Sequence, residues 1–153
     1  MSLKLDYFSL APQAIEILMQ QEHYLRQQFS NSNVLSTEIW ELIKLRVSQM
    51  NQCAFCIDMH SKDALKHGES VERIVGLNAW RDTPQYSDIE IVVLALAEKL
   101  TLGEAIEDDE FSNIQQMLSD KDIVNLTIAI NAINSWNRVA KTFKQEVGSY
   151  KPQ

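Results

Sequence analysis

Apolar residues recur every three or four positions along most of this chain, and that spacing predicts helices rather than strands. After Pro12, for example, Ile15, Leu18, Met19 and Leu25 keep helical spacing, with polar residues on the opposite face. Valine and isoleucine are common, but they follow the same spacing and do not alternate with polar residues as in a half-buried strand. The pattern predicts an all-α fold with about seven helices.

Capping and turn residues predict where these helices begin and end. Ser36 precedes one helical stretch as its N-cap, and Ser87 with Glu90 forms the capping box of a strongly apolar helix that ends near Gly103. Residues 1–11 are expected to be extended. The predicted helices cover residues 12–29, 36–50, 51–68, 70–80, 87–103, 108–118 and 119–146.

Length and composition are those of one ordinary globular domain. The chain has 153 residues, of which 45% are hydrophobic and 23% are charged. A chain of this size buries roughly 68–70% of its unfolded surface, so a core without disulfide bonds is feasible. Since no internal repeat or low-complexity linker divides the sequence, we predict a single domain over residues 1–153. The net charge of −7 gives no electrostatic reason to bind nucleic acid or an anionic membrane.

The N-terminal residues and the longest apolar run both argue against targeting to or across a membrane. Residues 1–6 lack the basic and then apolar segments of a signal peptide, and no apolar run approaches the ~20 residues of a membrane span. We therefore predict a cytoplasmic protein, in a compartment that keeps thiols reduced. There, a close cysteine pair indicates catalysis or metal binding rather than a structural disulfide.

The densest chemistry lies in residues 51–60, NQCAFCIDMH. The chain's only two cysteines, Cys53 and Cys56, are three positions apart, and His60 follows four positions later. On a helix, these three side chains share one face. Asn51 is a good N-cap, which would place Cys53 in the first helical turn and Cys56 in the second. The partial positive charge of a helix N-terminus favours a thiolate there.

Glu41 is a candidate partner for this segment if the chain turns between them. On one continuous helix Glu41 would lie about 18 Å from Cys53, but residues 48–51 are a plausible break. His60 could then take a proton from Cys56, and Glu41 could orient His60. A sulfenic acid on one cysteine would condense with the other to a disulfide. Proximity to His60 favours Cys56 as the reactive thiol, whereas the helix start favours Cys53.

The cysteine pair has two other interpretations. Two cysteines three positions apart can simply be small buried core residues. Cys53, Cys56 and His60 could also supply three zinc ligands, but no second cysteine or histidine pair completes a common structural zinc site. We therefore predict no metal. His23 and His67 are expected on the surface.

The spacing of Glu41, eleven residues, Cys53-X-X-Cys56, three residues and His60 resembles the core motif of the alkylhydroperoxidase D (AhpD)-like family. That family belongs to the carboxymuconolactone decarboxylase superfamily. Four segments in the right order also resemble its single-repeat members: LRVSQ at 45–49, CIDMH at 56–60, AWRDTP at 79–84 and INSWNR at 133–138.

The resemblance implies an all-α fold that assembles into trimers or hexamers. It also implies a thiol-dependent peroxidase with an antioxidant role, acting on a small peroxide and recharged by a dithiol donor such as a lipoyl-type protein. By this resemblance Cys56 is the peroxidatic cysteine and Cys53 resolves it. His60 would be the base, and Glu41 the far end of the proton relay. No bound cofactor is expected.

Two positions depart from the family's pattern. Phe55 stands where the best-known peroxidase of the family has histidine and where single-repeat members often carry tyrosine, so its side chain cannot relay a proton. Gln52 stands where many members have glycine, which makes the turn before the cysteines less permissive.

Two other functions stay open at this point. One is a lyase acting on a carboxymuconolactone-like lactone acid, which would need a basic pocket; Arg46, Arg81 and Arg138 are the candidates for it. The other is a non-enzymatic redox sensor that uses the same dithiol.

Overall fold

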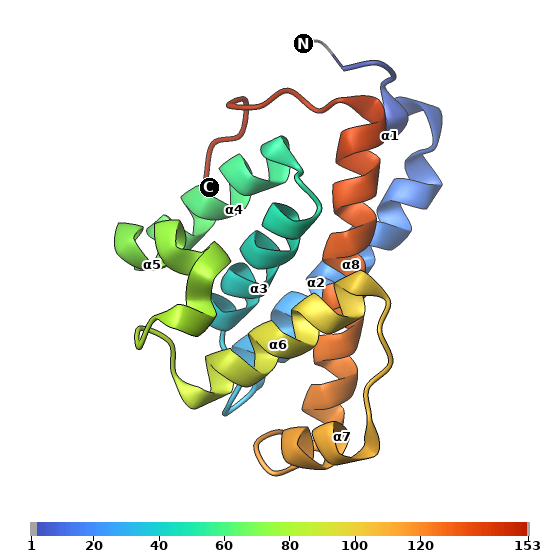
Figure 1. Ribbon diagram of the computed structural model, residues 1–153. Coiled ribbons are helices and arrows are strands. Elements are labelled where there is room, and N and C mark those ends of the chain that lie inside the picture. The colour runs from blue at the N-terminus through green and yellow to red at the C-terminus, as the bar shows by residue number, and fades with distance from the viewer. Residues whose placement is uncertain (1–2, 153) are drawn as a thin grey trace.

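The computed structural model describes residues 3–152, and over these residues the chain is helical without any strand, which confirms the all-α prediction (Figure 1). None of the helices within this range is long and apolar enough to cross a lipid bilayer. The described residues form eight α-helices and one 3₁₀ helix: α1 (Tyr7–Leu10), α2 (Pro12–Asn31), α3 (Thr37–Met50), α4 (Ala54–Lys66), α5 (Val71–Gly76), η1 (Leu77–Asp82), α6 (Asp88–Leu102), α7 (Asp108–Gln115) and α8 (Asp120–Phe143).

Helix α3 lies at the centre of the fold, between α4 on one side and α6 and α8 on the other (Figure 1). Its predicted inner face is confirmed, because Ile39, Trp40, Ile43 and Val47 are all buried in the largest apolar cluster. Full burial of a large apolar side chain stabilises a fold by roughly 1.5–3 kcal/mol. Packing of this face therefore fixes the position of α3, and with it the α3 side chains that face α4.

The predicted caps form as expected at the ends that local sequence controls. The Ser36 side chain accepts a hydrogen bond from the backbone N–H of Ile39 at 3.3 Å. Ser87 and Glu90 form the predicted capping box, and α6 ends at Gly103 in the left-handed conformation, with φ 75°. These helix ends depend on residues within one turn of each other, which is why the sequence alone could place them.

Residues 1–11 were expected to be extended, and this is wrong for the part that the structure describes. Tyr7–Leu10 form the short helix α1, whose N-cap Asp6 accepts a hydrogen bond from the backbone N–H of Ser9 at 3.3 Å. Tyr7 is buried and stacks on Phe143 of α8, with ring centroids 5.1 Å apart. A single helical turn is too short to show periodicity, and contact with the distant α8 holds it. Residues 1 and 2 lie outside the described range.

Other predicted boundaries shift as well. The single helix expected over residues 70–80 is two short helices, α5 and η1, and Ala79 has non-helical dihedral angles. Helix α7 ends at Gln115 rather than at residue 118. Helix α8 ends at Phe143 rather than near residue 146, because Lys144 adopts a left-handed conformation with φ 56°.

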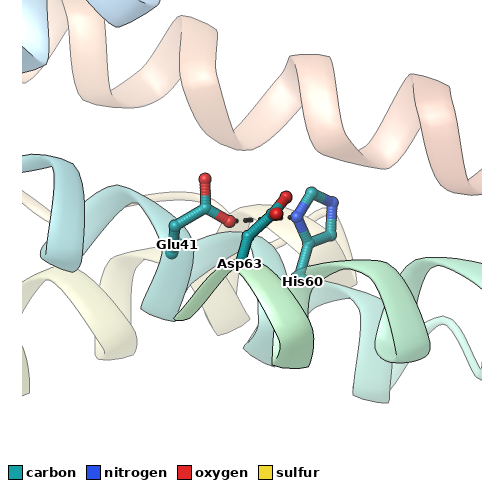
Figure 2. A group of neighbouring side chains, drawn as sticks. All are labelled: Glu41, His60 and Asp63. Atoms are coloured by element: carbon teal, nitrogen blue, oxygen red, sulfur yellow. Dashed lines mark hydrogen bonds and ion pairs between the residues drawn. The ribbon is translucent and has the colours of Figure 1, made fainter. Parts of the chain in front are cut away.

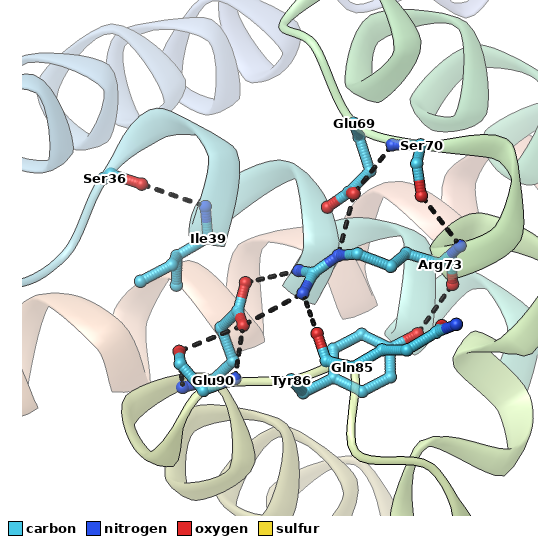
Figure 3. Close-up of polar contacts among 9 residues, drawn as sticks. Ser36, Ile39, Glu69, Ser70, Arg73, Gln85, Tyr86 and Glu90 are labelled. Atoms are coloured by element: carbon cyan, nitrogen blue, oxygen red, sulfur yellow. Dashed lines mark hydrogen bonds and ion pairs between the residues drawn. The ribbon is translucent and has the colours of Figure 1, made fainter.

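Hydrogen bonds and ion pairs of Arg73 connect α5 to the start of α6 (Figure 3). The Arg73 guanidinium donates to Glu69 at 2.8 Å, to Glu90 at 2.5 Å and to the backbone carbonyl of Gln85. The hydroxyl of Tyr86 donates in turn to the Arg73 carbonyl at 2.6 Å. This cluster holds α5 in place with polar contacts, since α5 contributes no fully buried residue.

Candidate active site

The turn between α3 and α4 brings the candidate residues together. The predicted break is present, but the prediction that Asn51 caps the cysteine helix is wrong: Asn51 ends α3, and Cys53 is the N-cap of α4. Gln52 between them is left-handed, with φ 52°, and the Cys53 N–H donates to the Ser48 carbonyl at 3.0 Å. The chain therefore reverses over two residues, and α4 packs back against α3.

Asn51 is held away from α4 by contacts with α8. Its side-chain amide donates to the side-chain oxygens of Asn134 and Asn137, each at 2.9 Å. These two contacts hold the side chain against α8, so it serves the packing of the turn, while Cys53 takes the N-cap position of α4. Local sequence could not show this, since the two partners lie more than eighty positions further along the chain.

Both cysteines lie nearer the start of α4 than the sequence predicted. Cys53 is the N-cap rather than a first-turn residue, and Cys56 is in the first turn rather than the second. The structure joins them as a disulfide, with Cα atoms 5.3 Å apart, a separation that this bond requires. They are buried at 1% and 4% exposure and pack against Ala140 of α8, with Phe55 partly buried beside them. The pair therefore sits where the N-terminal dipole of α4 favours a thiolate.

Glu41 and His60 face each other across α3 and α4, as the sequence predicted for a folded-back helix. His60 Nδ1 lies 3.1 Å from Glu41 Oε2, and both side chains are buried (Figure 2). A carboxylate at Nδ1 favours the tautomer with its proton there, which leaves Nε2 as the proton acceptor. In Figure 2 that second ring nitrogen points away from Glu41.

His60 and Lys44 together keep Glu41 ionised. The Lys44 ammonium lies 2.5 Å from Glu41 Oε1 and 3.8 Å from the centre of the Trp40 ring, and Lys44 is itself buried. Burial alone would raise the pKa of Glu41, but the hydrogen bond with His60 and the charge of Lys44 outweigh burial and lower that pKa to about 2. Glu41 is thus a fixed negative charge at neutral pH.

A second carboxyl group, Glu22 of α2, acts on the same site. Burial raises the pKa of Glu22, and the negative charge of Glu41 adds to this rise, whereas Lys44, His60 and a hydrogen bond from Trp136 oppose it. Two carboxyl groups around one histidine therefore have pKa values pushed in opposite directions. The sequence showed Glu22 only as one position in a helical pattern, so its role in the site was missed.

Asp63 and Tyr150 are two further site residues that sequence reasoning missed. The carboxylate of Asp63 lies close to both Glu41 and His60, with candidate ligand atoms of the three within 4.8 Å of one another (Figure 2). The Tyr150 hydroxyl donates to Asp63 Oδ1 at 2.8 Å. Burial, this contact and the charge of Asp63 raise the pKa of Tyr150 to about 12, so the hydroxyl stays protonated at neutral pH.

The C-terminal segment that carries Tyr150 crosses from α8 to α4 (Figure 1). Lys62 donates to the Tyr150 carbonyl at 3.1 Å and pairs with Asp58 at 2.7 Å. The Gly148 N–H also donates to Asp58, at 3.3 Å. Helical spacing from His60 could have suggested Asp63, which lies three positions later, but no pattern in the sequence pointed to the segment around Tyr150.

Glu41, His60 and Asp63 are also the residues within 3–152 that could converge on a metal ion. One oxygen of Glu41 is already paired with Lys44, and one oxygen of Asp63 accepts from Tyr150. The set considered from the sequence was different, and in the structure its two cysteines are bonded to each other. His23 and His67 are exposed, as predicted.

A separate buried carboxylate, Glu98 of α6, forms ion pairs with two of the three arginines considered for a basic pocket. It accepts hydrogen bonds from Arg46 Nε at 2.6 Å and Trp80 Nε1 at 2.8 Å, and it pairs with Arg81. Burial would raise the pKa of Glu98, but these three donors lower it. Of the three arginines, Arg138 is the one left without this carboxylate.

Residues 16–99, more than half of the chain, match the carboxymuconolactone decarboxylase family. The chain belongs to this family. The match spans Glu41, both cysteines and His60, and it agrees with the resemblance seen in the sequence.

Several known proteins are similar to this chain in sequence, in fold or in both. The uncharacterized protein YdfG of Bacillus subtilis (strain 168) is 41% identical over 142 residues, which cover 92% of this chain and 93% of that one. A structure from Agrobacterium tumefaciens, of unknown function and named as a candidate antioxidant defence protein AhpD, has a TM-score of 0.86 and 34% identity, covering 97% of this chain and all of its own. An uncharacterized peroxidase-related protein from Silicibacter sp. TM1040 shares the fold, with a TM-score of 0.80 at 20% identity, covering 93% of this chain and 74% of its own.

Proposed function

We propose that this protein is a thiol-dependent peroxidase in which Cys56 attacks a peroxide and Cys53 resolves the product. One observation carries the proposal: the helix that begins with the cysteine pair also presents His60, whose Nδ1 is hydrogen-bonded to the buried, ionised Glu41. A thiol, a base and a carboxylate that orients the base are the parts that nucleophilic thiol chemistry needs. The name of the Agrobacterium relative points to the same antioxidant class.

The first half-reaction begins from the reduced dithiol. His60 Nε2 takes the proton of the Cys56 thiol, and the thiolate attacks the terminal oxygen of the hydroperoxide. A sulfur–oxygen bond forms as the oxygen–oxygen bond breaks, and the leaving alkoxide takes the proton from His60 and departs as an alcohol. Cys56 is left as a sulfenic acid, and the peroxide has been reduced by two electrons.

The second half-reaction forms the disulfide that the structure shows. The Cys53 thiolate attacks the sulfur of Cys56, so that a sulfur–sulfur bond forms and the hydroxyl group leaves as water with one proton. A dithiol donor, for which we propose a lipoyl-type protein, then reduces the disulfide by thiol–disulfide exchange and is itself oxidised to a disulfide. One peroxide and one dithiol thus become an alcohol, water and a disulfide.

The order of the two cysteines follows from their distance along α4. Cys56 and His60 are four residues apart on the same helix, which makes them neighbours on its surface. Cys53 stands at the N-cap, one turn further from the base. We therefore assign the peroxide reaction to Cys56 and the resolving step to Cys53.

Assembly and location belong to the same proposal. We propose a cytoplasmic homo-oligomer, a trimer or hexamer, as the family resemblance implies. Sedimentation velocity of the purified protein tests the assembly, and a monomer at micromolar concentration would contradict it.

Single substitutions of the site residues test the peroxidase proposal in a coupled assay with an organic hydroperoxide and a dithiol donor. Cys56→Ser abolishes turnover, whereas Cys53→Ser consumes one equivalent of peroxide and then stalls. His60→Gln lowers the rate by about 10²–10⁴-fold, the usual contribution of a general base. His67→Gln, at the exposed end of the same helix, is the matched control. Full activity in Cys56→Ser would refute the proposal.

The lyase alternative has less support from the geometry. It needs cationic side chains for an acidic lactone, but two of the three candidate arginines, Arg46 and Arg81, are paired with Glu98, which leaves Arg138. Turnover of such a lactone by a Cys53→Ser, Cys56→Ser double variant would favour the lyase. A redox sensor without turnover would instead show a disulfide-dependent change of assembly and no catalytic loss of peroxide.

A further inference from the structure

A polar pocket of about 260 Å³ opens beside the turn that carries the cysteines. Asn51, two positions before Cys53, forms one wall, and the C-terminal part of α8 forms the other. Ala140, the residue before Lys141 in α8, packs directly against both cysteines. The pocket therefore borders the redox-active end of α4, and it is lined by Asn51, Asn137, Arg138, Lys141 and Thr142.

A network of hydrogen bonds holds two of the lining residues, Asn51 and Asn137. Asn51 donates to Asn134 and Asn137 at 2.9 Å each, and Asn137 donates to the hydroxyl of Ser48 at 3.0 Å. Asn134 and Asn137 are buried at 7% and 0% exposure. Buried amides with satisfied hydrogen bonds hold one geometry, so the side of the pocket formed by Asn51 and Asn137 is fixed before any ligand arrives.

Two positive charges line the pocket without a negative partner. Lys141 donates to the Asn51 carbonyl at 2.6 Å, and Arg138 donates to the carbonyl and side-chain oxygens of Asn134 at 2.9 and 3.2 Å. All of these acceptors are neutral. Among residues 3–152, no carboxylate forms an ion pair with either cation.

In having no carboxylate partner, Arg138 differs from three other arginines of this chain. Arg46, Arg73 and Arg81 all pair with glutamates. Arg138 and Lys141 lie three residues apart on α8 and so project from neighbouring positions on its surface. A guanidinium offers five N–H donors and an ammonium three, so both have donors left for an anion after their contacts with the protein.

We propose that this pocket binds the carboxylate of an acidic organic hydroperoxide, so that the enzyme prefers carboxylate-bearing peroxides to neutral ones. The inference rests on the proposed peroxidase function and names the substrate class of that site. Guanidinium and carboxylate form paired, charge-assisted hydrogen bonds. Complete small-molecule sites usually enclose about 300–1,000 Å³, so this pocket is of the size for the anionic end of a substrate. In this proposal, the peroxide group at the other end reacts with Cys56 through the two half-reactions given above.

Two matched substrates test this preference: cumene hydroperoxide and its para-carboxylate, which share one reacting group. We expect the ratio of kcat/KM for the carboxylate to kcat/KM for the neutral peroxide to fall about 10- to 100-fold in Arg138→Gln, as for the loss of a charged hydrogen bond. Arg138→Lys should restore part of the ratio. Lys121→Gln removes one positive charge at the far end of the same helix and is the control.

A direct binding measurement separates failure of this inference from failure of the peroxidase proposal. Calorimetry with 4-isopropylbenzoate, which carries no peroxide, should show binding to the unmodified oxidised protein and loss of binding in Arg138→Gln. If neither peroxide is turned over but the benzoate still binds through Arg138, the peroxidase proposal fails and the carboxylate site stands. An unchanged substrate ratio in Arg138→Gln, an equal change in Lys121→Gln, or no benzoate binding would overturn the inference.

Discussion

His60 Nδ1 lies 3.1 Å from Glu41 Oε2, although the two residues are 19 positions apart and belong to different helices. The contact exists because the chain reverses at Gln52 and packs α4 against α3. Both side chains are buried, so water screens their interaction only weakly. The pair fixes the orientation of the imidazole on the helix that carries the cysteines, and the proposed reaction depends on it.

The depressed pKa of Glu41 predicts a specific loss of stability in acid. The pKa falls from an ordinary value of 4.5 to about 2 in the folded protein, so ionised Glu41 stabilises the fold above about pH 4.5. This contribution, on the order of 3 kcal/mol, is lost as the pH falls from 4.5 toward 2. Urea unfolding of the oxidised protein between pH 6 and pH 2 measures the loss. Glu41→Gln should flatten that part of the profile, and an identical slope in both proteins would contradict the assignment.

Glu22 predicts a dependence of the opposite sign. Burial raises its pKa in the folded state, so between its unfolded and folded pKa values the folded chain keeps a proton that the unfolded chain has released. Stability therefore falls as the pH rises through this window, which begins near the ordinary value of 4.5. We expect Glu22→Gln to remove this fall and to be more stable than the unmodified protein at pH 8. The exposed Glu16→Gln on the same helix is the control, and a Glu22→Gln profile parallel to that of the unmodified protein would disprove the account.

The left-handed conformation of Gln52 predicts that a glycine at this position stabilises the fold. A non-glycine residue with φ 52° bears a steric cost of roughly 1–2 kcal/mol. Glycine relieves this cost, but its greater freedom in the unfolded chain cancels part of the gain. Gln52→Gly should therefore gain up to ~1 kcal/mol, a rise in Tm of about 2–4 °C for a chain of this size. Gln52→Ala keeps the Cβ and should give no such gain. Equal Tm values for the glycine and alanine variants, measured by calorimetry, would show that the turn is not strained.

The hydrogen bond from Tyr150 to Asp63 predicts that this contact anchors the C-terminal segment. Removal of the hydroxyl in Tyr150→Phe leaves Asp63 without its 2.8 Å donor and should cost about 1–3 kcal/mol, as for other hydrogen bonds to charged groups. Hydrogen exchange should then speed up in residues 144–152 and in the last turns of α4. Tyr24→Phe removes a hydroxyl that donates to the neutral side chain of Asn125 at 2.9 Å, and it should leave exchange in that segment unchanged. Unaltered exchange in Tyr150→Phe would mean that the backbone contacts with Lys62 and Asp58 are sufficient.

The sequence predicted those features that depend on residues close together in the chain. Ser36 and the pair Ser87 and Glu90 cap their helices as expected, because a cap is complete within one turn. The contact of Glu41 with His60 was also predictable once a break between them was placed, since a short turn leaves few ways to pack two helices.

The features that the sequence did not predict depend on distant partners. Asn51 had the residue type of an N-cap, but its side chain is bonded to α8 and the N-cap of α4 is Cys53. Glu22 and Tyr150 reach the site from α2 and from the C-terminal segment, and neither belongs to a local motif. Tertiary packing, rather than local preference, decided each of these positions.

Stopped-flow mixing of the reduced protein with a hydroperoxide, followed by mass spectrometry of both cysteines, tests the central claim most directly. The account predicts that Cys53→Ser forms a sulfenic acid on Cys56 with one equivalent of peroxide. It predicts that the unmodified protein passes to the disulfide between Cys53 and Cys56, and that His60→Gln slows the first step. A first oxidation on Cys53, or oxidation of both thiols no faster than in the urea-unfolded protein, would contradict the account.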